Sequence, residues 1–274
     1  MKLSQRKIDK TIKRLGLSED EAISYLCSIK NKPVHTKRYK HHYSTNHVKF
    51  IATGDSHISN MEFKEEYLDV LFQKALDEKV EAIYHTGDIT DGMYSNRPEQ
   101  MYELEDLGFD AQVERATKLL SQSPVKIYAI TGNHDFTHYR NTGADVGVAL
   151  EGKLGNFTNL GQDEADIELS KNVTMKLIHP GKGTAYAHSY NAQKLIESFE
   201  GGMKPNIVLE GHYHKLFQFF YRGVHHFDTG TLCGQTRFFR RMNLAAMKGF
   251  WVLDVRMNNT GVESIVSELV PFYD

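Results

Sequence analysis

The sequence predicts an α/β protein whose functional residues lie at the ends of its strands. Strand-like apolar segments alternate with helix-like amphipathic segments as far as Gly211, and consecutive strand-like segments follow. Five of the apolar segments stop at a glycine, a histidine or both, although the packing of a buried strand requires neither. Because ligands in open α/β folds bind beyond the carboxyl ends of the strands, we expect these five ends to meet at one site.

The expected elements follow from the spacing of apolar residues in chain order. Strands are expected within 50–57, 82–91, 126–131, 175–179 and 206–214. Between the first two, apolar residues recur at helical spacing from Glu62 to Val80, which predicts an amphipathic helix. A long helical region that is broken near Gly108 ends at Leu120, and another helix is expected from Asn191 to Phe199. From Phe217 onward the remaining segments favour strands.

The five strand ends carry side chains that can bind metals or transfer protons. In chain order these residues are Asp55, His57, Asp88, Asn133, His134, Asp135, His179, His212 and His214. A single polar turn would carry no functional meaning. Five such turns in one chain have no shared packing rationale, so we interpret them as one site.

This set of side chains suits a pair of divalent cations. Two ions about 3.5–4 Å apart need roughly four protein ligands each and one group that bridges them. A carboxylate bridges well, imidazole suits transition metals, and a neutral amide completes a shell without adding charge. Mixed nitrogen and oxygen ligation favours Mn²⁺, which we expect first, or Fe or Zn²⁺. Mg²⁺ and Ca²⁺ prefer shells made of oxygen.

The order of the five motifs, D-x-H, GD-x-x-D, GNHD, H and GH-x-H, resembles the calcineurin-like metallophosphoesterase superfamily. The resemblance extends from Val48 to Asp274 and is closest to the nuclease and phage-type branch of the superfamily. It implies a four-layer α/β/β/α sandwich, in which helices flank two facing mixed sheets and the metals lie at one rim. A small N-terminal helical arm would precede this sandwich.

The resemblance also implies a role for each residue of the site. The first metal would bind Asp55, His57, Asp88 and His214, and the second would bind Asp88, Asn133, His179 and His212. Asp88 would bridge the two ions, and Asp91 would support a ligand or cap a turn. In the implied reaction, hydroxide supplied at the metal pair attacks phosphorus in line, His134 protonates the leaving oxygen, and Asp135 orients the His134 ring. The alternative for His134 is a core histidine bonded to a backbone carbonyl.

The N-terminal part of the chain differs from the rest in charge. Residues 1–50 hold 12 Lys and Arg against 4 Asp and Glu, and residues 51–274 hold 21 against 31. We therefore expect residues 1–47 to form a separate basic arm, and residues 48–274 to form the catalytic domain. Helical spacing and a capping box at Ser18 and Glu21 predict a helical hairpin over Ser4–Ile29, followed by a basic linker over residues 31–47. The arm is interpreted as a polyanion-binding element or as a solvated extension.

Several cationic residues are candidates for contact with substrate. They are Arg140, Lys182 in a glycine loop, and Arg237 and Arg240 in a segment that mixes cations with aromatic residues. A plain turn with a surface lysine, and core aromatics with surface arginines, are the respective alternatives. Tyr94, Arg97 and Tyr102 are candidates for a lid, and core packing is the alternative for the two tyrosines.

Composition and charge narrow the function further. Cys27 and Cys233 form no disulfide framework, no segment has the length of a membrane span, and the first residues lack a signal-peptide pattern. We therefore expect a cytoplasmic protein with no membrane partner.

The expected function is hydrolysis of phosphodiester bonds in polynucleotides. Two alternatives remain: a phosphatase or phosphodiesterase for small nucleotides or phosphoproteins, and a non-catalytic scaffold of a polymerase or repair complex. The scaffold is the weakest, because every ligand position is filled.

Overall fold

Two six-stranded sheets form the centre of the protein. The structure is a computed structural model, and it describes residues 38–40, 43, 45–199, 202 and 204–273. By its internal contacts the chain divides into two units, Met1–Thr36 and Lys37–Asp274. The helical hairpin expected over Ser4–Ile29 lies outside the described residues and stays a prediction.

The first sheet has the strand order β12-β11-β2-β3-β4-β5. Its strands are β2 (His47–Thr53), β3 (Ala82–His85), β4 (Lys126–Thr131), β5 (Phe157–Gln162), β11 (Gly249–Asn258) and β12 (Gly261–Pro271). Strands β2, β3, β4 and β5 are parallel neighbours. Strand β11 runs antiparallel to both β2 and β12. The parallel part of this sheet therefore ends at one edge, as the sequence predicts for the first three motif strands.

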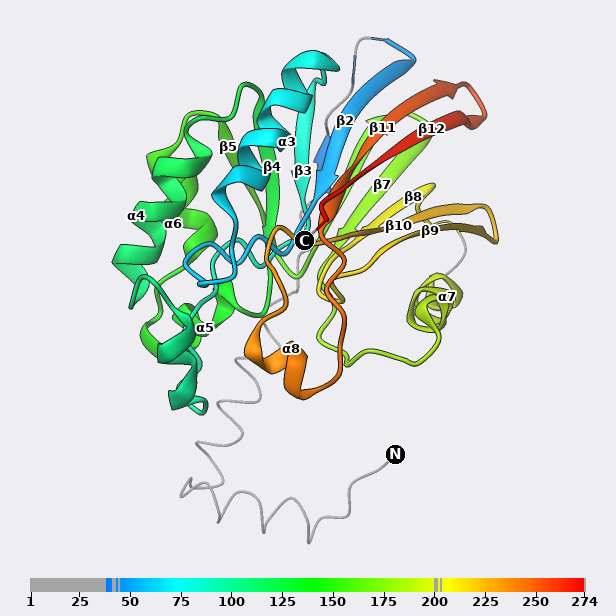
Figure 1. The fold of residues 1–274 in the computed structure, drawn as a ribbon. Coiled ribbons are helices and arrows are strands. Elements are labelled where there is room, and N and C mark those ends of the chain that lie inside the picture. The colour runs from blue at the N-terminus through cyan, green and yellow to red at the C-terminus, as the bar shows by residue number, and fades with distance from the viewer. Residues whose placement is uncertain (1–37, 41–42, 44, 200–201, 203, 274) are drawn as a thin grey trace, which may run out of the picture. The chain divides into compact units, whose positions relative to one another are not determined.

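Three helices pack on the outer face of the first sheet. They are α3 (Glu65–Asp77), α4 (Phe109–Leu120) and α6 (Val146–Lys153) (Figure 1). Helix α3 buries Leu68, Leu71, Phe72 and Ala75, which recur at helical spacing on one side. These residues join a core that also contains Ile51 of β2. The amphipathic pattern read over Glu62–Val80 thus corresponds to a shorter helix that begins at Glu65.

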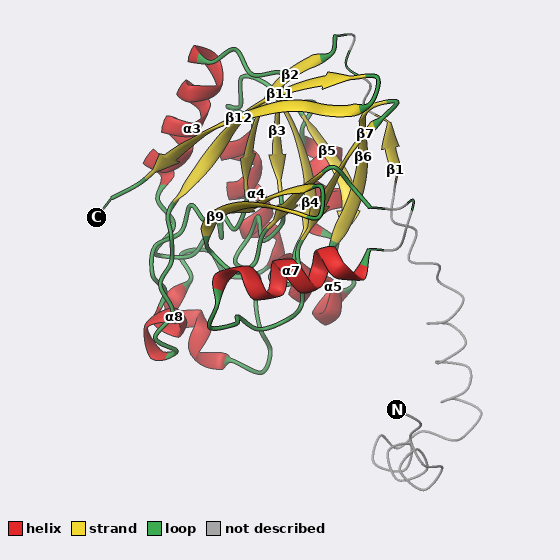
Figure 2. Ribbon diagram, turned by 90° about the vertical axis from the view of Figure 1, so that its right-hand side faces the viewer, coloured by secondary structure: helices red, strands yellow, loops and turns green. Residues whose placement is uncertain are grey.

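The second sheet has the strand order β1-β6-β7-β8-β10-β9. Its strands are β1 (Arg38–Lys40), β6 (Glu164–Ser170), β7 (Val173–Ile178), β8 (Ile207–Glu210), β9 (Leu216–Tyr221) and β10 (Val224–Thr229). Helix α7 (His188–Ser198) covers the outer face of this sheet, where Ile196 packs with Val208 and Val224. Figure 2, which views the molecule from this side, shows α7 in front of the strands.

A second core fills the space between the two sheets. Phe50 and Trp251 from the first sheet pack there with Leu177 and Leu209 from the second. Successive residues of a strand point to opposite faces, so Phe50 enters this core while Ile51 enters the core under the helices. This explains why the motif strands are apolar throughout. The arrangement, helices, sheet, sheet and helix in order across Figure 1, confirms the predicted four-layer α/β/β/α sandwich.

Part of the segment predicted as a basic linker belongs to the second sheet. Strand β1 pairs in parallel with β6, with Tyr39 opposite Ile167. The ring of Tyr39 also lies edge-on to Tyr128, with 5.7 Å between centroids. The hydroxyl of Tyr43 is 2.8 Å from that of Tyr84. Tyr39 and Tyr43 of this basic segment therefore pack on the body.

Three short helices complete the described part of the chain. They are the 3-10 helix η1 (Pro98–Glu103), α5 (Asp135–Thr142) and α8 (Arg237–Arg241). Helix α5 starts at Asp135, the last residue of the GNHD motif, and α8 lies within the segment that mixes cations with aromatic residues. Among the described residues, no helix is long and apolar enough to cross a membrane.

Candidate metal centre

The seven predicted metal ligands gather where strands of the two sheets end. Strands β2, β3 and β4 deliver Asp55, His57, Asp88 and Asn133 from the first sheet, and β7 and β8 deliver His179, His212 and His214 from the second. Because β7 and β8 are parallel, their carboxyl ends also lie at a common edge. The side chains form two clusters.

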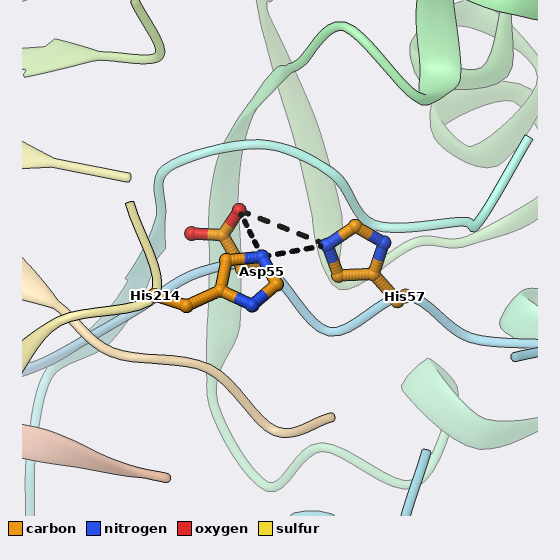
Figure 3. A group of neighbouring side chains, drawn as sticks. All are labelled: Asp55, His57 and His214. Atoms are coloured by element: carbon orange, nitrogen blue, oxygen red, sulfur yellow. Dashed lines mark hydrogen bonds and ion pairs between the residues drawn. The ribbon is translucent and has the colours of Figure 1, made fainter. Parts of the chain in front are cut away.

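The first cluster consists of Asp55, His57 and His214, which point toward one another in Figure 3. The two Nε2 atoms of His57 and His214 are 3.0 Å apart. Asp55 Oδ1 lies 3.4 Å from His214 Nε2 and 3.9 Å from His57 Nε2. All three residues are buried, and Asp55 Oδ1 has no hydrogen-bond partner among the described residues. Lone pairs that converge in this way repel one another unless a proton or a cation lies between them, and two imidazoles with a carboxylate are a donor set that fits a divalent ion.

The second cluster consists of Asp88, Asn133, His179 and His212. His179 Nε2 is 3.1 Å from Asp88 Oδ2 and 3.0 Å from Asn133 Oδ1. His212 Nδ1 is 2.8 Å from the same Asn133 oxygen. Two imidazole nitrogens, a carboxylate oxygen and an amide oxygen therefore face one point. This is the mixed nitrogen and oxygen set that transition metals accept.

Asp88 lies between the two clusters. Its Oδ2 is 3.9 Å from His57 Nε2 in the first cluster and 3.1 Å from His179 Nε2 in the second. Its Oδ1 accepts a hydrogen bond of 2.7 Å from the backbone N–H of His134. Burial raises the pKa of Asp88, but the charges of His179 and His134 outweigh it and hold that pKa well below its ordinary value. Asp88 is therefore ionised and presents one oxygen to both positions, as a bridging ligand must.

Hydrogen bonds to the far side of the rings fix two of the histidines. His57 Nδ1 is 2.8 Å from Asp91 Oδ1, and His179 Nδ1 donates to the carbonyl oxygen of Thr86 over 2.8 Å. A proton on Nδ1 leaves the Nε2 lone pair free to face a metal, which is the usual arrangement for metal-binding histidines. Asp91 thus has the geometry of a residue that supports a ligand.

The backbone around the clusters is unusual because the ligands lie in tight turns. Five of the predicted ligands take positive φ angles: Asp55 and His57 at 49°, Asp88 and His214 at 52°, and His212 at 78°. Non-glycine residues rarely adopt this region. A Cβ on Gly132 would lie 2.3 Å from Asp88 Oδ1, so this glycine is required for the GNHD turn to pass behind the carboxylate.

His134 lies beside the clusters and is held by a backbone carbonyl. Its Nδ1 donates to the carbonyl oxygen of Asp91 over 2.7 Å, and its ring lies edge-on to His57 at 4.4 Å between centroids. The side chain is 21% exposed. Burial lowers the pKa of His134, but Asp88, Tyr94 and Asp91 outweigh it and raise that pKa well above its ordinary value. Bound cations would offset part of the Asp88 effect. With Nδ1 bonded, Nε2 is the nitrogen that can carry a proton to substrate.

The prediction that Asp135 orients the His134 ring is wrong. Asp135 Oδ2 accepts the backbone N–H groups of Ile89 and Gly132, each over 3.0 Å. Its Oδ1 accepts both the backbone N–H and the hydroxyl of Thr90, each over 2.8 Å. Asp135 is the first residue of α5, so its side chain turns back toward the loop after Asp88. Asp135 therefore joins that loop to the GNHD turn by hydrogen bonds, and the residue that holds the His134 ring is Asp91.

Aromatic and cationic side chains surround the clusters. The guanidinium of Arg97 lies 4.6 Å from the ring centroid of Tyr94 and 4.8 Å from that of Phe238. Phe239 stacks on His214 with 4.5 Å between centroids. The sequence points to Tyr94 and Arg97 as lid candidates, but it does not single out Phe238 or Phe239. The only signal for these two is their position between the arginines of the segment 236–241.

The four predicted substrate residues differ in their surroundings. Arg237 and Arg240 lie on α8, the helix that carries Phe239, and Arg240 forms an ion pair of 3.2 Å with Glu62. Arg140 lies over the ring of Phe136, at 5.5 Å. Lys182 is exposed, three residues after His179.

A further group of buried ionisable residues lies on the outer face of the second sheet. His226 Nε2 is 2.6 Å from Glu210 Oε2 and 3.8 Å from Asp228 Oδ1. The first distance is typical of a direct hydrogen bond. Two atoms that bind one ion, each over about 2.0–2.2 Å, would lie farther apart than this. Burial and the charge of Glu210 raise the pKa of Asp228 well above its ordinary value. We interpret this group as a buried hydrogen-bonded pair, His226 and Glu210, with Asp228 beside it.

Comparisons with known proteins identify one matching family. The model of the calcineurin-like phosphoesterase family matches residues 48–216. No curated protein matches the chain. Solved structures with a similar chain include an archaeal phosphodiesterase, at 15% identity and a TM-score of 0.47, covering 81% of this chain and 99% of that one. Vps29 of Entamoeba histolytica in complex with zinc matches at 14% identity and a TM-score of 0.42, covering 82% and 99%. A conserved uncharacterised protein of Streptococcus pneumoniae, described as a predicted phosphoesterase, matches at 12% identity and 0.40, covering 82% and 98%.

The matched segment 48–216 is more than half of the chain and contains all seven predicted ligands. Its two donor clusters meet the need of this family for divalent metals. The chain therefore belongs to the calcineurin-like phosphoesterase family, and it is a hydrolase acting on phosphoester bonds.

Proposed function

We propose that the protein is a binuclear metal-dependent phosphodiesterase that hydrolyses polynucleotides. The observation that carries this proposal is the pair of buried donor clusters that share Asp88, with His134 beside them. Two ions at these positions, Mn²⁺ first and Fe or Zn²⁺ next, would provide a nucleophile at neutral pH and neutralise charge on the phosphate oxygens. The proposed ligands are those named above, four for each position with Asp88 in common.

The residues of the chain perform the remaining steps. Asp91 holds His57 through its carboxylate and His134 through its carbonyl oxygen, so it sets the relative placement of a ligand and the proton donor. His134 holds a proton at Nε2 and delivers it to the leaving oxygen of the substrate. The upward shift in the pKa of His134, caused first by the charge of Asp88, favours the protonated ring before the reaction.

The surroundings of the centre support a polynucleotide as the substrate. Arg97 lies between the rings of Tyr94 and Phe238, and the exposed residues Arg237 and Arg241 lie on the adjacent helix α8. Aromatic faces and cations in alternation suit stacked bases and a phosphate backbone. The basic balance of residues 1–50, 12 cations against 4 anions, adds a second region that attracts a polyanion.

One observation favours a small substrate instead. Residues 51–274 carry 21 Lys and Arg against 31 Asp and Glu, and this negative balance would repel a long polyanion. A phosphodiesterase for small nucleotides or phosphoproteins is therefore the second candidate. The buried, free thiol of Cys233 supports a cytoplasmic location for either.

A substrate panel in the presence of Mn²⁺ tests the proposal. It compares single- and double-stranded DNA, RNA, cyclic nucleotides and bis-p-nitrophenyl phosphate. We expect kcat/KM to be highest for one of the polynucleotides. The Asp88→Asn variant, purified in the same way, is the control for contaminating nucleases. Turnover of the small diesters alone would favour the second candidate.

Removal of residues 1–36 tests the proposed role of the basic arm. This boundary keeps strand β1 in the second sheet. We expect hydrolysis of bis-p-nitrophenyl phosphate to stay nearly unchanged, while polynucleotide binding weakens and its salt dependence becomes shallower because fewer counterions are released. Unchanged polynucleotide binding would leave the arm without this role.

A further inference from the structure

The side-chain amide of Asn133 lies between the second cluster and Tyr94. Its oxygen faces the cluster, 2.8 Å from His212 Nδ1 and 3.0 Å from His179 Nε2. Its nitrogen faces away and donates a hydrogen bond of 2.7 Å to the Tyr94 hydroxyl. The two ends of one amide are therefore in different environments, and Tyr94 contacts the end that does not face the other predicted ligands.

An amide ligand has a weakness that a carboxylate ligand does not share. Its two ends are nearly equal in shape, but only the oxygen has lone pairs that can bind a cation. Rotation of the Asn133 amide by half a turn would direct an NH₂ group at the metal position and remove one ligand. A carboxylate at the same place would present an oxygen after either rotation. Asn133 therefore depends on a group that holds its amide in one orientation.

Tyr94 is fixed firmly enough to do this. Its ring lies edge-on to that of His134, with 5.1 Å between centroids, and the Arg97 guanidinium lies over its face. Its backbone N–H donates to Gln100 Oε1 over 2.8 Å, and Gln100 Nε2 donates to the Asp91 carboxylate over 3.0 Å. The segment that carries Tyr94 is thus bonded to the same aspartate that supports His57 and His134.

We propose that Tyr94 is a positioning residue that holds the Asn133 amide with its oxygen toward the second metal position. The proposal rests on the binuclear centre proposed above. The Tyr94→Phe variant keeps the ring and its contacts with His134 and Arg97 but removes the acceptor of the amide. We expect binding of one ion to weaken by about 10–100-fold, the usual effect of losing a group that orients a ligand, while the other ion binds as before.

Titration of the metal-free protein with Mn²⁺ or Co²⁺ tests the proposal without substrate. The number of ions and both dissociation constants are measured by calorimetry, and the Co²⁺ absorption spectrum reports ligand geometry. Tyr102→Phe is the matched control, because Tyr102 lies in the same segment and is 79% exposed. We expect this control to bind both ions like the wild-type protein.

A double-mutant cycle separates orientation of the amide from general packing. In an Asn133→Asp background the ligand no longer needs an orienting partner, so Tyr94→Phe should weaken the affected ion by less than about threefold. An equal penalty in both backgrounds, or weakening of both ions together, would show that Tyr94 acts by packing and would overturn the proposal. So would unchanged affinities in Tyr94→Phe. If the wild-type protein binds a single ion, the binuclear centre itself fails, and the Tyr94 proposal with it.

Discussion

Replacement of Asp135 should destabilise the fold rather than slow proton transfer selectively. Its carboxylate accepts four hydrogen bonds, three from the backbone N–H groups of Ile89, Thr90 and Gly132 and one from the Thr90 hydroxyl. All of these groups are buried. The carboxylate is therefore the common acceptor for two loops that carry predicted ligands.

The size of the effect follows from the donors left without an acceptor. Each unsatisfied buried donor costs about 1–3 kcal/mol. Asp135→Ala orphans three backbone N–H groups, while the Thr90 hydroxyl can rotate, so a loss of at least about 3 kcal/mol is expected. In Asp135→Asn the amide oxygen can keep the Ile89 and Gly132 donors. One backbone donor, that of Thr90, then lacks an acceptor, and the loss should be about 1–3 kcal/mol.

Urea unfolding measures this loss in the metal-free proteins. Trp251, the one tryptophan of the chain, is buried in the core between the sheets and reports unfolding by fluorescence. A chelator is needed throughout, because bound metal would stabilise each variant by its own amount. In parallel, kcat is compared for diesters with good and poor leaving groups. We expect both variants to lose activity equally for the two classes, since Asp135 acts through the loop of Asp88.

Two results together would refute this reasoning. The first is a loss of stability below about 1 kcal/mol in Asp135→Ala, which is less than one orphaned donor should cost. The second is a loss of activity that grows as the leaving group becomes poorer. That pattern would indicate that Asp135 does orient His134, the proton donor.

Three further predictions concern single residues. Asp88→Asn should weaken both metals and abolish hydrolysis while circular dichroism shows the fold retained; elemental analysis that finds two ions still bound would contradict bridging. His134→Ala should keep its metal content and slow turnover by about 10²–10⁴, with a smaller loss for p-nitrophenyl esters, which need little protonation; an equal loss for all leaving groups would assign His134 another role. Burial and the charge of Glu210 raise the pKa of Asp228 in the fold, so folding favours the protonated carboxyl. This preference stabilises the fold fully below the unfolded pKa of ~3.9, and the stabilisation is lost as pH rises through the folded pKa. Asp228→Asn should therefore be more stable than wild type at pH 8, by a margin in unfolding free energy that shrinks toward pH 4; a margin independent of pH would exclude titration of Asp228 as the cause.

The sequence predicts the α/β class and the convergence of the ligands because both depend on local patterns, whereas the four-layer arrangement follows from the resemblance to the family. Apolar strands that are buried on both faces read as continuous runs, and a polar residue after such a run must lie at a sheet edge. Asp55, His57 and Asp88 follow directly from this rule on the first sheet. His179 and His212 follow from it on the second.

Other features have no local signal. The direction of the Asp135 side chain depends on the start of α5, which turns it toward the loop of Asp88 and away from its neighbour His134. Strand β1 pairs with β6, more than a hundred residues later, and three residues of a basic segment do not reveal such a partner. The contact of Tyr94 with Asn133 and the stacking of Phe239 on His214 join segments that are far apart in the chain.

The positive φ angles lower the stability of the fold at the same residues that are needed as metal ligands. At Asp55, His57, Asp88, His212 and His214 the backbone adopts a conformation that costs a non-glycine residue on the order of 1 kcal/mol. Glycine at any of these positions would relieve the strain and remove a metal ligand in the same step. Selection for stability alone would therefore replace these ligands by glycine one at a time, without changing either hydrophobic core. Only a continued requirement for hydrolysis keeps aspartate and histidine where the backbone favours glycine.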